Sequence, residues 1–331
     1  MLKMIFSLLV CPICKSNLHW DVYNEDYKRI INAKALCVEC KNTYHISDEI
    51  GYFLCEKELI EDSWQYEKNV LDELSENEIQ QLLKAPISTL NDVDLYYLGQ
   101  IKRQQGKHNT YNKLKVIERQ KRYSTKYLKV MQGLFETMQN LISNKSILLD
   151  IATGTGTLLR WLEKANFDLV ICSDISYYIM KELKKDLITR NTYEKASLLV
   201  MNAEKMPFLP KSIPFITSYL GLGHISDNKS FLNEVKRVLI EDFYSIEIFY
   251  PENNDSNHKY ITQNCMEENL FERLIFDIAN KNDLLYTSIK KEYVQLDAVK
   301  SGIIINKTSH KLPIEATEVT LNLLNIKNQQ H

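Results

Sequence analysis

Two groups of residues in this chain of 331 residues have the types and spacing that chemistry requires, and the first is a set of paired cysteines. Cys11 and Cys14 form one CxxC pair, and Cys37 and Cys40 form a second. Each pair can fold into a tight turn that directs two thiolates at one metal ion, and two such turns complete a tetrahedral site. Because four protein ligands leave no open coordination position, we predict a structural zinc ion.

The remaining cysteines do not suggest a disulfide framework, since Cys55, Cys172 and Cys265 stand alone. The 22 residues between the two pairs slightly exceed the usual spacing of ~15–20. Structural zinc contributes ~10–16 kcal/mol to small metal-dependent folds, which suffices for a unit with little core. We therefore predict a zinc ribbon over residues 1–55.

The second group surrounds a glycine turn, where the apolar run 147–149 leads through Asp150 to Gly154 and Gly156 and then to a helical pattern. Glycine lets a ligand approach the backbone where a Cβ atom would collide. Asp150 can orient amides of the turn and attract an ammonium group. A GxG turn alone also fits a purely structural role, so its neighbours decide the interpretation.

The ends of the next two predicted strands add the groups that adenosine requires. Asp174 lies twenty residues after Gly154 and can accept hydrogen bonds from both ribose hydroxyls. Asn202 can accept one from the adenine amino group. A dinucleotide cofactor is disfavoured by Leu159, which occupies the position of a third small residue, and the chain has no GxxxxGK[ST] phosphate loop.

Four stretches that follow one another in the chain carry a resemblance to a known family: 148–156, 173–176, 202–208 and 218–225. They resemble class I S-adenosylmethionine-dependent methyltransferases of the small-molecule and quinone type. The resemblance implies S-adenosylmethionine as the cofactor, with the two glycines beside its methionine part, Asp174 at the ribose, and Ile175 and Ala203 beside the adenine. The predicted cofactor site comprises Asp150, Ala152, Gly154, Gly156, Asp174, Ile175, Asn202 and Ala203.

The chain departs from that family in three places. Asn202 stands where aspartate is common, residues 240–242 replace a Pro-Gly-Gly turn, and no Asn-Pro-Pro-Tyr-like run follows the fourth strand. The last difference argues against methylation of adenine amino groups. Methyl transfer mainly needs an oriented acceptor, since orientation can lower a barrier by ~7–11 kcal/mol. His224 is a candidate base or substrate contact, or a packed loop histidine, and Tyr219 is a weaker candidate.

The cysteine segments have a resemblance of their own. Residues 9–15 and 37–46 are similar to small zinc-ribbon proteins that activate partner methyltransferases, and to the ribbon of the bacterial ribosomal RNA guanine-N1 methyltransferase. That enzyme has histidine as its last ligand, where this chain has Cys40. This difference weakens the prediction of an RNA acceptor, which stays an alternative.

The segment Lys102–Lys129 is strongly basic, with ten Lys or Arg residues against the single acid Glu118, whereas residues 56–94 hold eleven acids and three bases. Basic residues interleaved with tyrosines can bind single-stranded RNA. The same segment can instead be a solvated helix face paired with the acidic segment, or a helix that recognises an acidic small substrate above the cofactor. The net charge of −2 argues against a surface devoted to nucleic acid.

Alternating apolar and amphipathic runs predict a Rossmann-like α/β fold, with a mostly parallel seven-stranded sheet. Strands are expected at 147–149, 169–172, 198–201, 215–219, 244–249, 286–294 and 302–306, and helices at 157–164, 177–187, 229–239 and 266–279. Residues 56–144 are predicted as a helical linker covering the substrate site, 145–310 as the cofactor-binding domain and 311–331 as a C-terminal tail. Ligands of such sheets bind at the carboxyl ends of the strands.

The composition is that of a globular protein, with 44% hydrophobic and 25% charged residues. The apolar stretch 1–10 reaches Cys11 without a cleavage site, so we expect a buried strand and not a signal peptide. No run approaches the ~20 apolar residues of a membrane span, and we expect a cytoplasmic location with reduced thiols.

The sequence thus predicts a methyltransferase that acts on a small-molecule or natural-product acceptor. The alternatives are a methyltransferase of RNA bases and a non-catalytic protein that keeps the fold to activate a partner enzyme. The intact Asp150, Gly154, Gly156 and Asp174 argue against the non-catalytic alternative.

Overall fold

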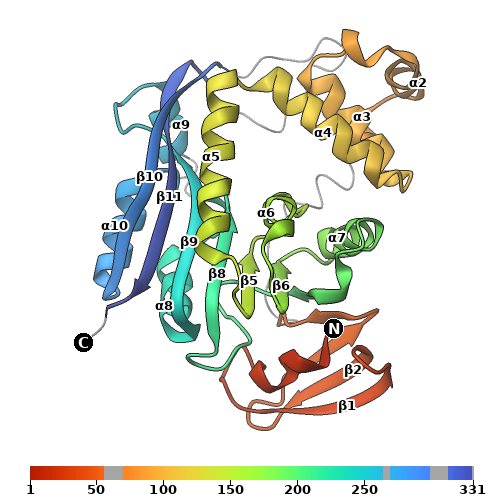
Figure 1. Ribbon diagram of the computed structural model, residues 1–331, viewed down its shortest axis with the longest axis vertical. Helices are drawn as coiled ribbons and strands as arrows, with labels where there is room; N and C mark the ends of the chain where they lie inside the picture. Colours follow the sequence, from red (N-terminus) through yellow and green to blue (C-terminus); the bar gives the residue numbers. More distant parts are fainter. Residues whose placement is uncertain (56–69, 264–268, 299–311, 330–331) are drawn as a thin grey trace.

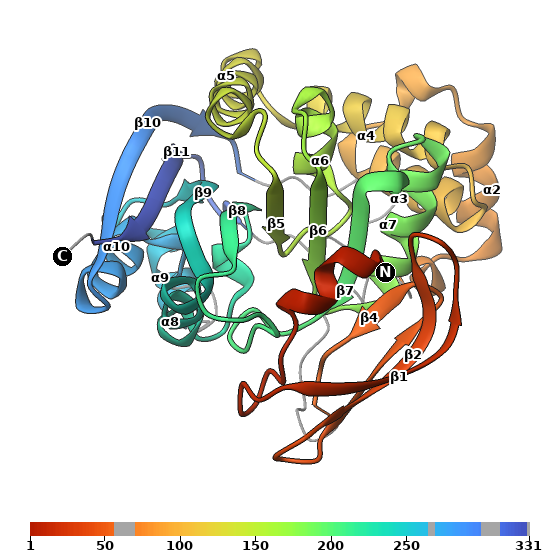
Figure 2. The ribbon, with the colours of Figure 1, turned by 60° about the horizontal axis from the view of Figure 1, so that its bottom comes forward.

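The computed structural model describes residues 1–55, 70–263, 269–298 and 312–329. Within them, eleven strands form one mixed sheet in the order β1-β2-β3-β4-β7-β6-β5-β8-β9-β11-β10, which Figure 2 shows from one edge to the other. The strands are β1 (Leu18–Glu25), β2 (Ile30–Cys37), β3 (Thr43–Ser47), β4 (Ile50–Tyr52), β5 (Ile147–Ile151), β6 (Leu169–Asp174), β7 (Ala196–Val200), β8 (Ile213–Tyr219), β9 (Leu239–Phe249), β10 (Leu284–Leu296) and β11 (Thr317–Asn328).

The middle of the sheet is parallel, from β4 through β7, β6, β5 and β8 to β9. Parallel strands are covered on both faces, so their sequences are apolar almost throughout, as in β7, where every residue is buried. Leu148 and Leu149 belong to different core clusters, as expected for neighbours that point to opposite faces. The predicted α/β class with a mostly parallel central sheet is confirmed.

Helices cover both faces of this sheet (Figures 1 and 2). One face carries α5 (Thr125–Ile142), α6 (Thr157–Trp161) followed by η4 (Leu162–Lys164), and α7 (Tyr177–Thr189), with η5 (Tyr193–Lys195) leading to β7. The other carries α8 (Asn228–Val238) and α10 (Glu272–Lys281), while α9 (Ser256–Gln263) lies near the end of β9. The predicted helix at 266–279 therefore begins later, at Glu272, and part of its predicted range lies outside the described residues.

The N-terminal strands extend the sheet instead of forming a separate unit. Gly51 of β4 pairs with Leu199 of β7, and the Phe53 amide donates to the Val200 carbonyl oxygen at 2.8 Å. The apolar side chains of Ile50 and Phe53 are buried, so this pairing removes them from water. The described sheet has eleven strands, of which β5–β11 are seven and β1–β4 continue the sheet past β7. A separate sheet of seven strands is therefore not confirmed.

The first residues form the 3₁₀ helix η1 (Lys3–Leu8), so the prediction of a buried strand there is wrong. Only the flanking residues Leu2 and Leu9 make isolated β-bridges. Ile5 is fully buried whereas the neighbouring Met4 is half exposed. The buried residues therefore lie on one face of a helical turn, which a short and mostly apolar stretch does not reveal.

The C-terminal part contains a strand that the sequence left unassigned. β11 lies between β9 and β10 and pairs antiparallel with both. Its residues Val319, Leu321 and Leu323 pack in the cluster that also contains α5, so residues 317–328 are part of the core and not a tail. The strand predicted at 302–306 lies outside the described residues.

Residues 70–122 form a helical layer with its own small core. It consists of η2 (Val70–Glu73), α2 (Glu76–Lys84), η3 (Ile87–Thr89), α3 (Asp92–Gln104) and α4 (His108–Arg122). Capping boxes at Ser75 and Asn91 start α2 and α3, because each side chain accepts from the third helical amide. Figure 1 shows these helices and strands β1 and β2 at opposite ends of the molecule. No helix in the described ranges is long and apolar enough to cross a membrane.

Candidate functional site

The carboxyl ends of three adjacent parallel strands bring the predicted cofactor residues together. Ile151 at the end of β5 pairs with Ser173 of β6, and Asp174 pairs with Val200 of β7. Two further hydrogen bonds close the group. The Gly154 amide donates to Asp174 Oδ2 at 3.0 Å, and the Met201 amide donates to the Asp174 carbonyl oxygen at 3.0 Å.

The turn after β5 depends on its glycines. Ala152, Gly154 and Gly156 have φ values of 51°, 54° and 73°, in the left-handed region. Gly156 is the N-cap of α6, and a Cβ atom there would lie 2.7 Å from Leu183 Cδ1 of α7. Both the backbone conformation and the close packing of α7 therefore require glycine at this position.

Asp174, at the end of β6, holds the turn in place. Its carboxylate accepts from the amides of Gly154 and Ser176, at 3.0 and 3.2 Å, and the residue is only 6% exposed. Ile175, the next residue, is half-buried. A carboxylate held by two backbone amides is fixed in position, which a residue that recognises ribose hydroxyls requires.

Asp150 lies beneath the turn, where it is 1% exposed. Its Oδ1 accepts from the Thr217 hydroxyl of β8 at 2.8 Å. Burial raises the pKa of this carboxyl group to about 7, against the opposing effect of the hydrogen bond from Thr217. The structure gives Asp150 a contact with β8, whereas the sequence predicted contacts with amides of the turn.

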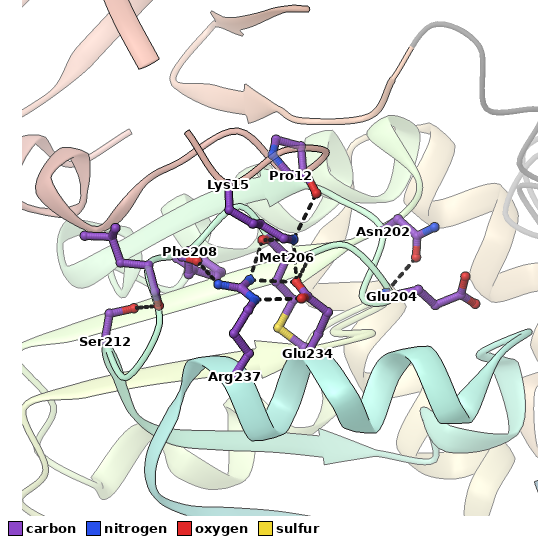
Figure 3. Close-up of polar contacts among 10 residues, drawn as sticks. Pro12, Lys15, Asn202, Glu204, Met206, Phe208, Ser212, Glu234 and Arg237 are labelled. Atoms are coloured by element: carbon purple, nitrogen blue, oxygen red, sulfur yellow. Dashed lines mark hydrogen bonds and ion pairs between the residues drawn. The ribbon is translucent and has the colours of Figure 1, made fainter. Parts of the chain in front are cut away.

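Asn202 and Ala203 follow β7 and are half-buried. Asn202 Oδ1 accepts from the Glu204 amide at 2.8 Å and the Asn202 carbonyl oxygen accepts from the Lys205 amide at 3.0 Å, so the chain turns tightly here. Figure 3 shows Asn202 and Glu204 beside the polar group formed by Lys15, Glu234 and Arg237. The adenine side of the predicted site is thus built by a short, well-connected loop.

The loop after β8 lies against the glycine turn. A Cβ atom on Gly221 would approach Ser218 Oγ to 2.2 Å and Ala152 Cβ to 3.0 Å, so glycine is required for this contact. The loop continues into η6 (Leu222–His224). The residue His224 is exposed to solvent. The protein around its imidazole nevertheless desolvates the ring in part, which lowers its pKa. A neutral imidazole at neutral pH is the form that can accept a proton.

Tyr219 occupies the end of β8 beneath the helical layer. Its hydroxyl oxygen accepts from Arg119 Nη2 of α4 at 3.2 Å, and its ring lies 5.1 Å from that of Phe135. Burial raises the pKa of Tyr219, so the phenol is neutral. α4 also reaches the glycine turn, because Lys115 Nζ donates to Thr155 Oγ1 at 2.7 Å.

Sequence reasoning missed Glu247 of β9, which supports the loop after β8. Its Oε1 accepts from the Ser245 hydroxyl at 2.6 Å and from the Leu222 amide at 3.3 Å. The residue is 3% exposed, and burial raises its pKa to about 7. A single acid between apolar residues of a buried strand was the signal that could have identified it.

The four paired cysteines meet in one cluster, in which all Sγ atoms lie within 4.8 Å of one another. The Cys11–Cys40 and Cys14–Cys37 sulfur distances are 3.5 and 3.3 Å. Tetrahedral zinc with ~2.3 Å bonds separates its sulfur ligands by ~3.8 Å, so the cluster fits such an ion.

The surroundings of the cluster also fit a metal site. Lys15 and Lys41, each directly after the second cysteine of its pair, have φ of 61° and close the two tight turns. The Tyr44 hydroxyl lies 3.2 Å from Cys11 Sγ, and Asn42 Nδ2 donates to Cys40 Sγ at 3.2 Å. Hydrogen bonds from Ser16 lower the pKa of Cys14 to about 6, which favours the thiolate that metals bind.

Several cations of the segment Lys102–Lys129 make contacts within the protein. Arg119 donates to Tyr219, Lys121 donates to the Ser88 carbonyl oxygen at 3.2 Å, and Arg122 forms ion pairs with Asp92 and Glu118. These three side chains hold α4 to its neighbours. Their internal contacts favour the structural interpretation of the basic segment over the nucleic-acid interpretation.

Comparison with known proteins identifies similar sequences over part of the chain. Residues 149–244 match the family model described as a methyltransferase domain. The ubiquinone/menaquinone biosynthesis C-methyltransferase UbiE of Rickettsia typhi is 34% identical over 105 residues, which are 30% of this chain and 41% of that protein. The protein of the same name from Rickettsia peacockii is 31% identical over 109 residues, which are 31% of this chain and 44% of that protein. The chain therefore spans less than half the length of these curated relatives.

Two solved structures are also similar. The YcgJ protein of Bacillus subtilis aligns with a TM-score of 0.47 and 15% identity, over 60% of this chain and 99% of that one. Geranyl diphosphate C-methyltransferase of Streptomyces coelicolor aligns with a TM-score of 0.43 and 12% identity, over 59% of this chain and 80% of that one. The segment 149–244, which matches the methyltransferase family model, contains the glycine turn, Asp174, Asn202 and the loop after β8.

Proposed function

We propose that the protein is an S-adenosylmethionine-dependent methyltransferase that acts on a small-molecule acceptor. One observation carries the proposal: the glycine turn, Asp174 and Asn202 meet at the carboxyl ends of three adjacent parallel strands, inside the segment that matches a methyltransferase domain. Ligands of such sheets bind at this edge. The names of the curated relatives, which are C-methyltransferases of quinone biosynthesis, support a small acceptor.

Each residue of the site has a role in this proposal. Gly154 and Gly156 leave room for the methionine part, Asp174 accepts from the ribose hydroxyls, and Asn202 and Ala203 border the adenine. The bound cofactor supplies an electrophilic methyl group. The protein orients the acceptor, and His224, neutral at physiological pH, accepts a proton where the acceptor carries one.

We also propose that Cys11, Cys14, Cys37 and Cys40 hold a structural zinc ion. The sulfur distances and the hydrogen bonds of Tyr44 and Asn42 support this assignment. Four thiolates leave no open position, so the ion stabilises the ribbon and takes no part in methyl transfer.

Calorimetric titration with S-adenosylhomocysteine tests the cofactor site. We expect micromolar binding to the zinc-loaded wild type and no detectable binding to Asp174→Ala, because that variant loses the ribose acceptor and the anchor of the glycine turn. Absence of binding to the correctly folded wild type would refute the proposed function.

A matched pair of glycine variants tests the turn itself. Gly156 and Gly106 have nearly equal φ values of 73° and 71°, but a Cβ atom on Gly106 meets nothing within 4 Å. Both Gly→Ala changes add the ~1–2 kcal/mol cost of a left-handed residue. Only Gly156→Ala should also weaken S-adenosylhomocysteine binding, by ~10-fold or more, because its Cβ collides with Leu183. Equal affinities of the two variants would contradict a role for this turn in binding.

A further inference from the structure

A chain of polar contacts connects the first cysteine pair to the segment that follows β7. Lys15, the residue after Cys14, donates from Nζ to the Pro12 carbonyl oxygen at 2.9 Å and to the Met206 carbonyl oxygen at 3.3 Å. The same ammonium group forms an ion pair with Glu234 Oε2 at 2.8 Å (Figure 3). Lys15 therefore joins the turn of the cysteine pair to the methyltransferase domain.

Glu234 of α8 is the centre of this group. Besides Lys15, it accepts from the Met206 amide at 2.7 Å and from Arg237 Nε and Nη2 at 2.6 and 2.7 Å. Burial alone would raise the pKa of Glu234, but hydrogen bonds from Arg237 and Lys15 lower it. The carboxylate is thus charged, and only 9% of the residue is exposed to solvent.

The segment 206–209 is held from both sides. On one side, Arg237 donates to the carbonyl oxygens of Phe208 and Met206, at 2.5 and 3.0 Å. On the other, the Val10 amide donates to the Pro207 carbonyl oxygen at 3.0 Å, and the Leu209 amide donates to the Leu8 carbonyl oxygen at 2.8 Å. Met206 and Phe208 are fully buried. The residues that precede the first cysteine pair thus form one wall of this segment, and α8 forms the other.

The same segment leads directly to the adenine side of the cofactor site. Only three residues separate Asn202 from Met206. The hydrogen bonds of Asn202 with Glu204 and Lys205 restrict the conformation of this short connection. The Glu204 carboxylate also accepts from the Asp227 amide at 2.8 Å, at the start of α8. A displacement of Met206 would therefore move Asn202.

We propose that Glu234 is a positioning residue that couples metal binding at the cysteine cluster to adenosine binding at Asn202 and Ala203, through Lys15 and the segment 206–209. This inference rests on the proposed function, since it assumes that Asn202 and Ala203 border the adenine. Because coupling between two sites is reciprocal, S-adenosylhomocysteine must strengthen zinc binding by the factor by which zinc strengthens cofactor binding.

The decisive measurement is the affinity for zinc in competition with a chelator, with and without saturating S-adenosylhomocysteine. In the wild type we expect the ligand to increase zinc affinity about five-fold or more, the lower end of typical coupling. In Lys15→Met and Glu234→Gln the increase should disappear. Lys236→Met is the control, because Lys236 lies on the same helix but pairs with Asp283, and it should behave as the wild type. Unchanged coupling in Lys15→Met and Glu234→Gln, or no coupling in the wild type, would overturn the inference.

Hydrogen exchange separates a failure of this inference from a failure of the proposed function. In zinc-loaded protein without any cofactor, amides of residues 202–209 should exchange faster in Lys15→Met and Glu234→Gln than in the wild type, while those of 220–225 should not. This result would uphold the connection even if the protein bound no S-adenosylhomocysteine. Equal exchange at 202–209 in all variants would show that the cysteine pair does not hold this segment.

Discussion

Glu247 and Asp150 are buried carboxyl groups beneath the predicted cofactor site, and each has a hydroxyl partner. Burial raises the pKa of both groups to about 7. Between the ordinary pKa of a carboxyl group and this value, the folded protein binds protons that the unfolded chain has already released. Stability must therefore fall as the pH rises through this window and level off above pH 7.

The variant Glu247→Gln tests this effect at a residue that sequence reasoning did not identify. Glutamine keeps an oxygen that accepts from Ser245 and Leu222 but cannot ionise. The variant should therefore lack the part of the pH-dependent loss of stability that Glu247 causes. Its free energy of unfolding should therefore rise relative to that of the wild type, by up to about 3 kcal/mol between pH 5 and pH 8. Urea unfolding without cofactor measures this difference. Asp150 titrates in both proteins, so its contribution cancels in the difference between their free energies of unfolding. Parallel pH profiles of wild type and variant would contradict the prediction.

The residues that the sequence did predict share a local signal. The glycine turn, the acid at the end of β6 and the two CxxC pairs are each defined by residue type and spacing within a few positions. Lys115 has no such signal and Glu247 has only its place between Ile246 and Ile248, which marks a buried acid but not its partner. Their contacts with Thr155 and Leu222 join parts of the chain that only the fold brings together. The same reason explains why the sequence did not predict the contact of the Asp150 carboxylate with Thr217 of β8.

Among the elements, α4 contacts both the glycine turn and the end of β8, and its predicted role as a cover of the substrate site stays a prediction. Lys115 contacts the glycine turn at Thr155, and one helical turn later Arg119 contacts Tyr219 at the end of β8. Residues four apart lie on the same face of a helix, so both cations point toward the carboxyl ends of the strands. In our proposal the methionine part of the cofactor, which carries a carboxylate, lies beside the turn that Lys115 contacts.

Lys115→Met tests this position of α4. We expect the variant to bind S-adenosylhomocysteine ~5–30-fold more weakly, because it loses a charge-assisted hydrogen bond worth ~1–2 kcal/mol. Binding of 5′-methylthioadenosine, which lacks the carboxylate, should not change. Lys113→Met, on an exposed position of the same helix, serves as the control and should bind both ligands as the wild type does. A parallel loss of both ligands in Lys115→Met would show that the residue acts on folding and not on the carboxylate.

The elements also mark where periodicity is informative and where it is not. The strands β5 to β8 and helices α7 and α8 follow the predicted ranges closely, because apolar runs and amphipathic runs alternate between clear boundaries. β9 begins five residues before its predicted start, at Leu239, which was predicted to be helical. Position in the sheet does not follow from such runs. β11 lies between two strands that precede it in the chain, and nothing local in residues 317–328 indicates this insertion.

At the scale of the whole molecule, the ribbon and the methyltransferase domain share one sheet and one core. The largest core cluster contains Cys11, Cys37 and Tyr44 of the ribbon together with Ile216 and Phe243 of β8 and β9. Units that share a core unfold together. The sequence predicted two successive parts, since composition changes between them, but it could not show that β4 pairs with β7.

We therefore expect a single thermal transition for the zinc-loaded protein, and we expect chelation of the metal to move that whole transition to lower temperature. Each kcal/mol of stability lost lowers the midpoint temperature by ~2–4 °C, so the loss of several kcal/mol with the metal should lower it by ~10 °C or more. Differential scanning calorimetry measures it. Cys14→Ser should reproduce the shift, whereas Cys55→Ser, outside the cluster, should leave the transition unchanged. Two separate transitions in the wild type would show that the parts unfold independently.

The pairing of β4 with β7 also constrains the order of events during synthesis. Gly51 and its partner Leu199 are about 150 residues apart, so the ribbon can take up its metal on the ribosome long before its docking strand has been made. Phe53 already has Trp20 and Tyr44 as partners within the N-terminal strands, whereas Ile50 packs in the cluster that contains residues of β6, β7 and α7. Until those elements are made, Ile50 is exposed and favours association with other chains. Arrest of translation before Ala196 should therefore yield a nascent chain that holds zinc but remains prone to aggregate.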